Sequence, residues 1–376
     1  MIRLGTIASA AATATLALGG AANAGVVSGT HGNLTWQATN YIVGQTSTAT
    51  QAAGGDPRYF APMPQYSGVA ALIMNFENGS FICSGSLLPD RQSILTAAHC
   101  VTPDATSGAL QGTTAYFYGG PNPDTVVPFN AASTAVSVSD VFIHPLYSGN
   151  VIDQNDIAVL RLGTVAPLFA ASYGLSADNS LTGDGYNIAG YGGRSDTGGN
   201  LGANLGTGRL RQGDNRYDFR MGDADFAGGW ELILGQPTSQ IEYSYIADFD
   251  NGKAANDATC LVAADPFFGL GGPKYCDLGM GADEVSSAGG DSGGPQFDAA
   301  MNIMSITSYG LTFGIPEYGD VDGNLNSSFG EFNGFVPIYI HRDFILANMV
   351  SEPSSMLLAA MAGLALVGSR RRRVQP

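Results

Sequence analysis

The sequence predicts an all-β protein with two similar antiparallel β halves, each a sandwich or barrel, and a short closing helix at the C-terminal end. Short runs of strand-forming residues follow one another between positions 69 and 340, separated by turn residues such as Asn78-Gly79. No stretch among them keeps a 3.6-residue period, and this pattern indicates a sandwich or barrel. Residues 167–181 contain no such run and divide the chain into two similar halves.

The elements can be placed in order along the chain. Residues 25–66 are rich in glycine, alanine and threonine, which indicates a leader or arm, and a propeptide is one form that such a leader takes. A tract at 192–214 lacks an apolar period and is expected to be a surface insertion. Residues 341–349 can form the closing helix, which must end before Pro353. Domain boundaries are expected at 67–349 for the whole domain, with halves at 67–166 and 182–340. Strands are expected at 69–76, 80–88, 93–97, 114–118, 135–143 and 157–162, and then at 185–190, 230–234, 239–249, 295–297, 302–309 and 334–340.

The N-terminal end has the features of a secretory signal. Arg3 provides the positive charge, residues 4–18 form an apolar run, and Ala22-Asn23-Ala24 is a small-x-small cleavage motif. We therefore expect residues 1–24 to direct export to an oxidising compartment, where disulfides form.

The C-terminal end combines Ser351-Glu352-Pro353, an apolar run at 356–367 and four arginines at 370–373. The apolar run is shorter than the roughly 20 residues of a membrane span. Residues 350–376 resemble the PEP-CTERM sorting signal of Gram-negative bacteria, although Ser351 replaces its first proline. The resemblance implies transient membrane contact through the tail, processing by an exosortase-type enzyme, and a cell-surface or matrix location. An ordinary C-terminal anchor is the alternative.

Charge and cysteine content narrow the possible partners. The chain has 32 acidic and 16 basic residues, a net charge of −16, so we expect no nucleic acid partner. We also expect a monomer. Four cysteines allow three pairings, and the short separations favour Cys83–Cys100 and Cys260–Cys276. A zinc site is the rival interpretation, but no CxxC spacing supports it, and no metal or cofactor is expected.

Three motifs carry residues suited to nucleophilic catalysis. Ser292 lies within Gly-Gly-Asp-Ser-Gly-Gly-Pro, His99 within Leu-Thr-Ala-Ala-His-Cys, and Asp156 at the start of an apolar run. Each residue alone has a structural explanation, as a turn serine, a packed histidine or a strand-start aspartate. Together they provide a nucleophile, a general base and an acid that orients the base.

These motifs, in this order, resemble those of the chymotrypsin/trypsin-like serine proteases, the peptidase S1 family. The similarity covers residues 68–349 and implies two six-stranded barrels. It also implies a secreted endopeptidase that hydrolyses protein or peptide substrates through an acyl-enzyme, with Ser292 as nucleophile and His99 and Asp156 assisting it. By the same resemblance, the N–H groups of Gly290 and Ser292 form the oxyanion hole, and Cys83–Cys100 is the disulfide beside the histidine. Substrate backbone then pairs with the strand of Ser308, Tyr309 and Gly310.

Departures from the family pattern concern specificity and activation. Ala288 replaces a cysteine that braces the substrate pocket, and neutral Ser286 stands at its floor, which favours an apolar or aromatic P1 residue. In the family, a freed Ile-Val-Gly-Gly amine pairs with the aspartate before the nucleophile, here Asp291. Ile42-Val43-Gly44-Gln45 matches partly, after Tyr41.

A late insertion contains a second acidic pattern. Asp320, Asp322, Asn324 and Asn326 precede Glu331, which is the twelfth position, as in a calcium loop. Leu325 occupies the place of the usual glycine, so a plain acidic turn is favoured.

Two other functions remain open. A catalytically silent binding protein of the cell surface or matrix would share the fold. An esterase would share the triad and the acyl-enzyme chemistry.

Overall fold

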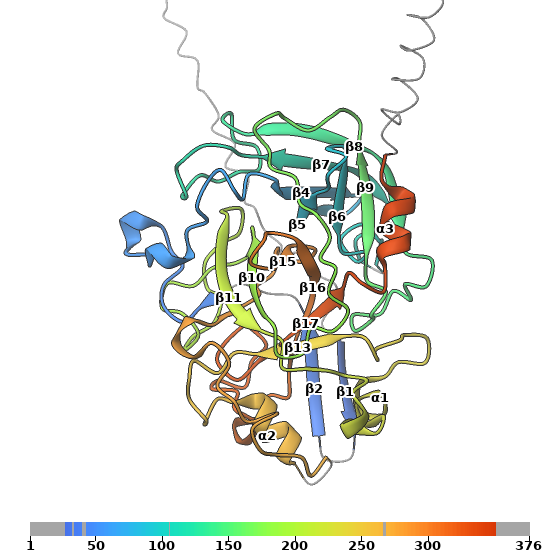
Figure 1. The fold of residues 1–376 in the computed structure, drawn as a ribbon. Coiled ribbons are helices and arrows are strands. Elements are labelled where there is room, and N and C mark those ends of the chain that lie inside the picture. Colours follow the sequence, from blue (N-terminus) through green and yellow to red (C-terminus); the bar gives the residue numbers. More distant parts are fainter. Residues whose placement is uncertain (1–26, 32–33, 40–42, 105, 266–267, 351–376) are drawn as a thin grey trace, which may run out of the picture.

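The computed structural model describes residues 27–31, 34–39, 43–104, 106–265 and 268–350 (Figure 1). The expected signal peptide, Ile42 and the C-terminal tail after Val350 lie outside these ranges. The described part is mostly β, with short helices, in two halves that lie one above the other in Figure 1. The all-β, trypsin-like fold class predicted from the sequence is confirmed.

The first half is a closed antiparallel barrel in the strand order β4-β5-β6-β9-β8-β7. Its core contains fully buried aliphatic side chains such as Leu72, Leu95 and Leu160. Strand β8 is exposed or half-buried at every position except Val136, whereas β4 is buried at every position except Asn75. The difference arises because β4 also contacts β10 of the second half. The bounds are β4 (Val69–Phe76), β5 (Gly79–Leu87), β6 (Ser93–Thr96), β7 (Leu110–Phe117), β8 (Thr134–Ile143) and β9 (Ala158–Leu162).

The second half is an open sheet, or half-barrel, in the order β11-β10-β15-β16-β17-β13-β12. The resemblance implied a closed six-stranded barrel here, and the sheet does not close among the described residues. A separate two-stranded sheet joins β14 to β3. The bounds are β10 (Gly185–Gly190), β11 (Arg211–Arg216), β12 (Phe219–Arg220), β13 (Tyr245–Asp248), β14 (Val285–Ser286), β15 (Pro295–Phe297), β16 (Ile303–Thr312) and β17 (Phe332–Pro337).

The segment expected to be an arm contributes to this second half. Strands β1 (Val27–His31) and β2 (Leu34–Thr39) form a hairpin, and β2 also pairs with β16. Strand β3 (Val43–Gly44) pairs with β14. Val43 and Tyr59 are buried in a core cluster with residues of β10 and β17, so residues 43–66 pack as part of the folded domain.

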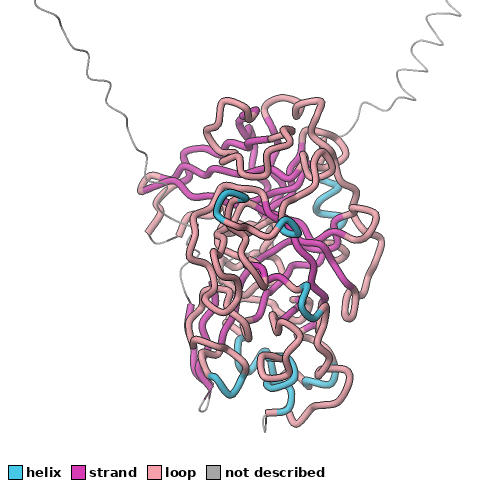
Figure 2. Tube along the Cα trace, turned by 90° about the vertical axis from the view of Figure 1, so that its left-hand side faces the viewer, coloured by secondary structure: helices cyan, strands magenta, loops and turns pink. Residues whose placement is uncertain are grey.

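The helices are few and short, as Figure 2 shows. Residues 230–234, expected to be a strand, lie in a helix that buries Trp230 against Phe219, where tertiary packing decides the conformation. The tract at 192–214 ends in β11. None of residues 239–244 is strand, and β13 begins only at Tyr245. The closing helix was predicted correctly. The helices are α1 (Gly229–Leu234), α2 (Ala258–Ala264), α3 (Arg342–Asn348), and the 3₁₀ turns η1 (Gln51–Ala53), η2 (Pro57–Tyr59), η3 (Ala224–Phe226), η4 (Gly281–Asp283) and η5 (Pro316–Tyr318).

Within the described ranges, no helix has both the length and the apolar character that crossing a membrane requires.

Candidate active site

His99 and Asp156 meet at the ends of two neighbouring strands of the closed barrel. His99 follows β6 and Asp156 precedes β9, and these strands pair with each other. The Nδ1 atom of His99 lies 2.7 Å from Asp156 Oδ2, and the His99 backbone N–H donates to Oδ1 over 2.8 Å. Two bonds to one carboxylate fix both the ring and the backbone of His99.

Ser308 of β16 adds a third bond to the same carboxylate. Its hydroxyl donates to Asp156 Oδ2 over 2.6 Å, and both residues are buried. Asp156 therefore receives hydrogen bonds from both halves of the protein. Three hydrogen bonds hold this buried carboxylate in one orientation.

Ser292 lies beside His99, on the segment between β14 and β15. Its carbonyl oxygen accepts a 2.9 Å bond from the Ser84 N–H and lies 3.7 Å from Cys100 Sγ, which is itself 3.8 Å from His99 Nε2. The Ser292 hydroxyl is buried and has no hydrogen-bond partner among the described residues. Serine–histidine bonds are often long in ligand-free enzymes and shorten when substrate binds.

The backbone from Gly290 to Ser292 presents two N–H groups that donate to no described residue. Gly290 has φ +105°, which side-chain-bearing residues rarely adopt. Its carbonyl accepts a 2.8 Å bond from the Ser84 hydroxyl and is thereby held in place. Within the described part of the chain, the N–H groups of Gly290 and Ser292 have no acceptor. Two such donors beside a serine can stabilise an oxyanion.

The Asp291 side chain points away from Ser292 into the protein. Its carboxyl accepts bonds from the N–H groups of Gly192 (2.8 Å) and Ala288 (2.9 Å). A Cβ on Gly190 or Gly192 would lie 2.0 or 2.1 Å from the Asp291 carboxyl oxygens, so both glycines are required to make room for it. Burial raises the pKa of Asp291 well above its ordinary value.

The floor of the expected substrate pocket is neutral and hydrogen-bonded. Ser286 donates its hydroxyl proton to Asn333 Oδ1 over 3.0 Å, and Ser287 donates to the same oxygen from its backbone N–H and its hydroxyl. All three residues are buried. The sequence analysis did not identify Asn333. It lies in β17, directly before the strand expected at 334–340, and this position was the available signal.

Tyr309 and Gly310 differ from what the sequence suggested. The Tyr309 ring is fully buried, and its hydroxyl lies 2.7 Å from Ser244 Oγ. The ring lies over Gly334, where a Cβ would come within 2.2 Å of it. Gly310 pairs with Thr39 of β2, in an antiparallel register that continues to Thr312. Strand β2 therefore pairs with Gly310, one of the three residues expected to bind substrate, and with the two residues that follow it.

Strand β3 connects the arm to the pocket floor. Val43 pairs with Ser286 and Gly44 with Val285. The activation residue Ile42 lies outside the described residues.

The two disulfides are Cys83–Cys100 and Cys260–Cys276, the short-range pairs that the sequence favoured. Cys83 and Cys100 are buried and hold β5 against the residue that follows His99. Cys260–Cys276 joins α2 to the loop that precedes η4. Two disulfides favour an extracellular protein.

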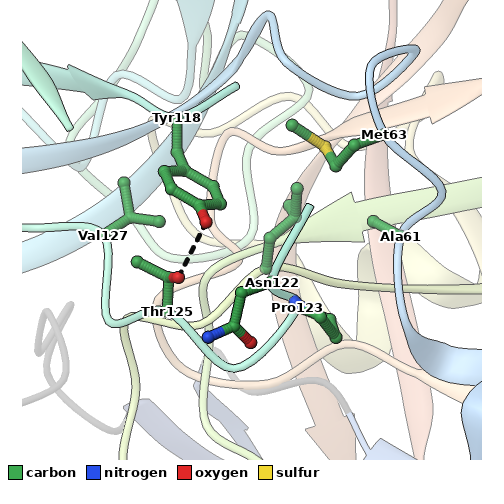
Figure 3. A pocket seen from close by; sticks show the side chains of 8 residues that line it. Ala61, Met63, Tyr118, Asn122, Pro123, Thr125 and Val127 are labelled. Carbon is green, nitrogen blue, oxygen red and sulfur yellow. Dashed lines mark hydrogen bonds between the residues drawn. The ribbon is translucent and has the colours of Figure 1, made fainter. Parts of the chain in front are cut away.

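A small surface pocket lies away from these residues (Figure 3). A hydrogen bond of 3.0 Å from Thr125 to the Tyr118 hydroxyl crosses one side of it. None of His99, Asp156 and Ser292 contributes to its lining, so we assign it no catalytic role. Its lining residues are Ala61, Met63, Tyr118, Asn122, Pro123, Thr125, Val127 and Leu210.

The acidic loop at 320–331 is satisfied mainly by its own groups. Asp320 Oδ1 accepts from the N–H groups of Asp322 and Gly323, and Glu331 Oε1 accepts from those of Asn326 and Ser328. These bonds fit the plain acidic turn that the sequence favoured.

Comparison with known proteins gives matches of one kind. The trypsin family pattern matches residues 60–217, which include His99 and Asp156. "Trypsin, alkaline B" of Manduca sexta is 24% identical over 70% of this chain and 83% of its own length. "Achelase-1" of Lonomia achelous is 32% identical over 32% of this chain and 50% of its own. "Serine protease Hayan" of Drosophila melanogaster is 37% identical over 26% of this chain and 14% of its own. These matches support a trypsin-like serine protease.

Proposed function

We propose that this protein is an exported serine endopeptidase that cleaves peptide bonds through an acyl-enzyme on Ser292. The hydrogen-bond network of His99, Asp156 and Ser308 beside a buried serine is the observation that carries the proposal. Ser292 attacks the scissile carbonyl, and His99 takes its proton and later returns it to the leaving amine. Asp156 holds the histidine tautomer and balances the imidazolium charge.

The N–H groups of Gly290 and Ser292 would receive the oxyanion. Losing one such donor typically costs about 2.7–4 kcal/mol of transition-state stabilisation. No metal or organic cofactor enters these steps, and the substrates are proteins or peptides.

For the substrate, we propose an apolar or aromatic P1 residue. Ser286 and Asn333 bond to each other, and the floor they form carries no negative charge to pair with lysine or arginine. Cleavage-site profiling on a peptide library tests this, and predominant cleavage after lysine or arginine would contradict it.

For activation, we propose that cleavage before Ile42 releases an amine that pairs with Asp291. Two observations support this. Asp291 is buried with backbone donors but has no cationic partner in the described ranges, and the Val43 backbone pairs with β14, close in sequence to Asp291. The intact arm would act as a brake, because β2 pairs with β16 where substrate is expected. N-terminal sequencing of the active enzyme should give Ile42.

For location, we propose export and retention at the surface or in the matrix of a Gram-negative bacterium, with the tail processed by an exosortase-type enzyme. The sequence features of both ends support this. Mass spectrometry of the mature protein from its native host tests it, since a chain that retains residues 1–24 or 350–376 would contradict the respective step.

The decisive experiment is labelling with a fluorophosphonate, which reacts with activated serines. The mature enzyme should be labelled at Ser292, and Ser292→Ala should abolish both labelling and peptide hydrolysis. Ser80→Ala, in an exposed position, is the matched control and should keep both. Turnover of esters without turnover of any peptide would favour an esterase. Absence of labelling in a chain that begins at Ile42 would favour a silent binding protein.

A further inference from the structure

Three carboxylates from two separate segments of the second half lie together in a buried cluster. Asp248 ends β13, Asp250 follows it, and Glu284 directly precedes β14. Asp250 is fully buried, and Asp248 and Glu284 are at most 5% exposed. Each offers a carboxylate oxygen, and these oxygens lie within 4.8 Å of one another.

One carboxylate oxygen of this cluster accepts no hydrogen bond from the described residues. Asp250 Oδ1 accepts a 2.6 Å bond from the Gly252 N–H, but the buried Oδ2 atom has no hydrogen-bond partner among the described residues. Burying an unpaired carboxylate oxygen costs free energy unless another group compensates it. A cation among the three carboxylates would supply that compensation.

The surroundings make the negative charge larger. The side chains of Asp218 and Asp257 lie close by, bonded to β13 and α2 respectively. The nearby Arg216 forms an ion pair with Asp277 and so offsets only part of this charge.

We propose that Asp248, Asp250 and Glu284 bind a calcium ion. Carboxylate oxygens without histidine or cysteine ligands select a hard cation. Calcium binds oxygens at about 2.3–2.6 Å, so its ligand oxygens lie within roughly 5 Å of one another, as the cluster oxygens do. Calcium also tolerates irregular coordination, whereas magnesium requires a near-octahedral site at about 2.0–2.1 Å.

The ion would close a long insertion at its base. Asp248 and Asp250 begin the segment that contains α2 and Cys260–Cys276, and Glu284 ends it. Glu284 is also two residues from Ser286, and Asn215 donates to the carbonyls of both Asp248 and Val285. Calcium would therefore hold the floor strand β14 in place. This consequence for the pocket rests on the proposed protease function, whereas the binding site itself does not.

Calorimetric titration of the full chain carrying Ser292→Ala, which prevents self-digestion, tests the site independently of activity. We expect one calcium per chain, removable by EDTA, with much weaker binding of magnesium. Asp250→Asn and Glu284→Gln should each weaken calcium binding more than about tenfold, because ligand charge sets affinity. Asp322→Asn, in the other acidic loop, is the matched control and should bind normally. Absence of calcium binding at millimolar concentration, or equal loss in Asp322→Asn, would overturn the proposal.

Thermal unfolding separates a lost ligand from a damaged fold. In EDTA, Asp250→Asn should melt at or above the temperature of the parent, because the substitution removes repulsion. Calcium should raise the melting temperature of the parent and leave that of Asp250→Asn unchanged, so that their order reverses. Melting of Asp250→Asn below the parent in EDTA would mean that the protein already compensates this charge, and would contradict the proposal.

Discussion

The two halves of this molecule solve the same packing problem differently. The first closes its six strands into a barrel, so every strand edge is paired. The second stays open, and β16 extends beyond β15 and pairs there with the arm strand β2. The closed half provides His99 and Asp156 from the ends of paired strands, where their geometry is fixed. The open half provides Ser292, which we propose as the nucleophile, Ser286 at the expected pocket floor, and an edge of β16 that pairs with β2. The candidate site therefore combines residues of a closed barrel with residues of an open sheet.

The largest expected effect tests the rigid half. Asp156→Asn should lower kcat about 10⁴-fold, because the amide no longer holds the required histidine tautomer or balances the imidazolium charge. The measurement is hydrolysis of a chromogenic peptide with an aromatic P1 residue. Asp153→Asn is the matched control, since Asp153 is equally buried in the same loop but bonds Ser148 and Asn155. It should keep the parental pH–rate profile, and a 10⁴-fold loss there would place the effect in the loop and not in the triad.

The disulfides provide the next comparison, since the closed loops are nearly equal, with sequence separations of 17 and 16. Replacing either pair by serines should lower the free energy of unfolding by about 3 kcal/mol. Loss of Cys83–Cys100 should also lower kcat, because it frees the chain next to His99. Loss of Cys260–Cys276 should leave kcat of the remaining folded protein unchanged. Denaturant unfolding and active-site titration separate the two effects, and equal losses of kcat would contradict the assignment.

The arm tests the open half. Gln37→Pro with Ala38→Pro should disrupt the pairing of β2 with β16, because proline cannot donate a ladder hydrogen bond. In a chain that is already cleaved before Ile42 but still retains the arm, kcat/KM should rise more than about tenfold, equivalent to 1.4 kcal/mol. A chain that begins at Ile42 and therefore lacks β1 and β2 is the control and defines the maximum. If the proline variant gives no gain while the truncated chain does, the arm acts by some means other than edge pairing.

The smallest effect concerns the contact between the halves. His341 donates from Nε2 to the Gln154 carbonyl over 2.7 Å, and burial lowers its pKa from 6.5 to about 4. A histidine with a depressed pKa binds protons mainly when unfolded, so stability is lost as pH falls from 6.5 towards 4. Between pH 6 and pH 5, the free energy of unfolding should fall by about 1 kcal/mol more in the parent than in His341→Asn. Urea unfolding at both pH values checks this prediction. An equal change in the free energy of unfolding in the parent and in His341→Asn would mean that His341 does not contribute.

The sequence by itself determined the fold class, because the strand runs and turns at 69–162 are local signals that the first barrel keeps. The sequence also identified the candidate site residues, since His99, Asp156 and Ser292 each lie in a recognisable local motif. The helix at 229–234 could not be predicted in this way, because Trp230 packs against Phe219 and Phe268, which both lie outside the helix.

Only the tertiary structure decided how the open half is used. No local signal joins β2 to β16, Asn333 to Ser286, or Asp248 and Asp250 to Glu284, because each of these contacts joins residues far apart in the sequence. The charges of that half were visible in the sequence, but their burial was not. Burial is what turns three ordinary carboxylates into a place for a cation, since desolvation makes the absence of a counter-charge costly.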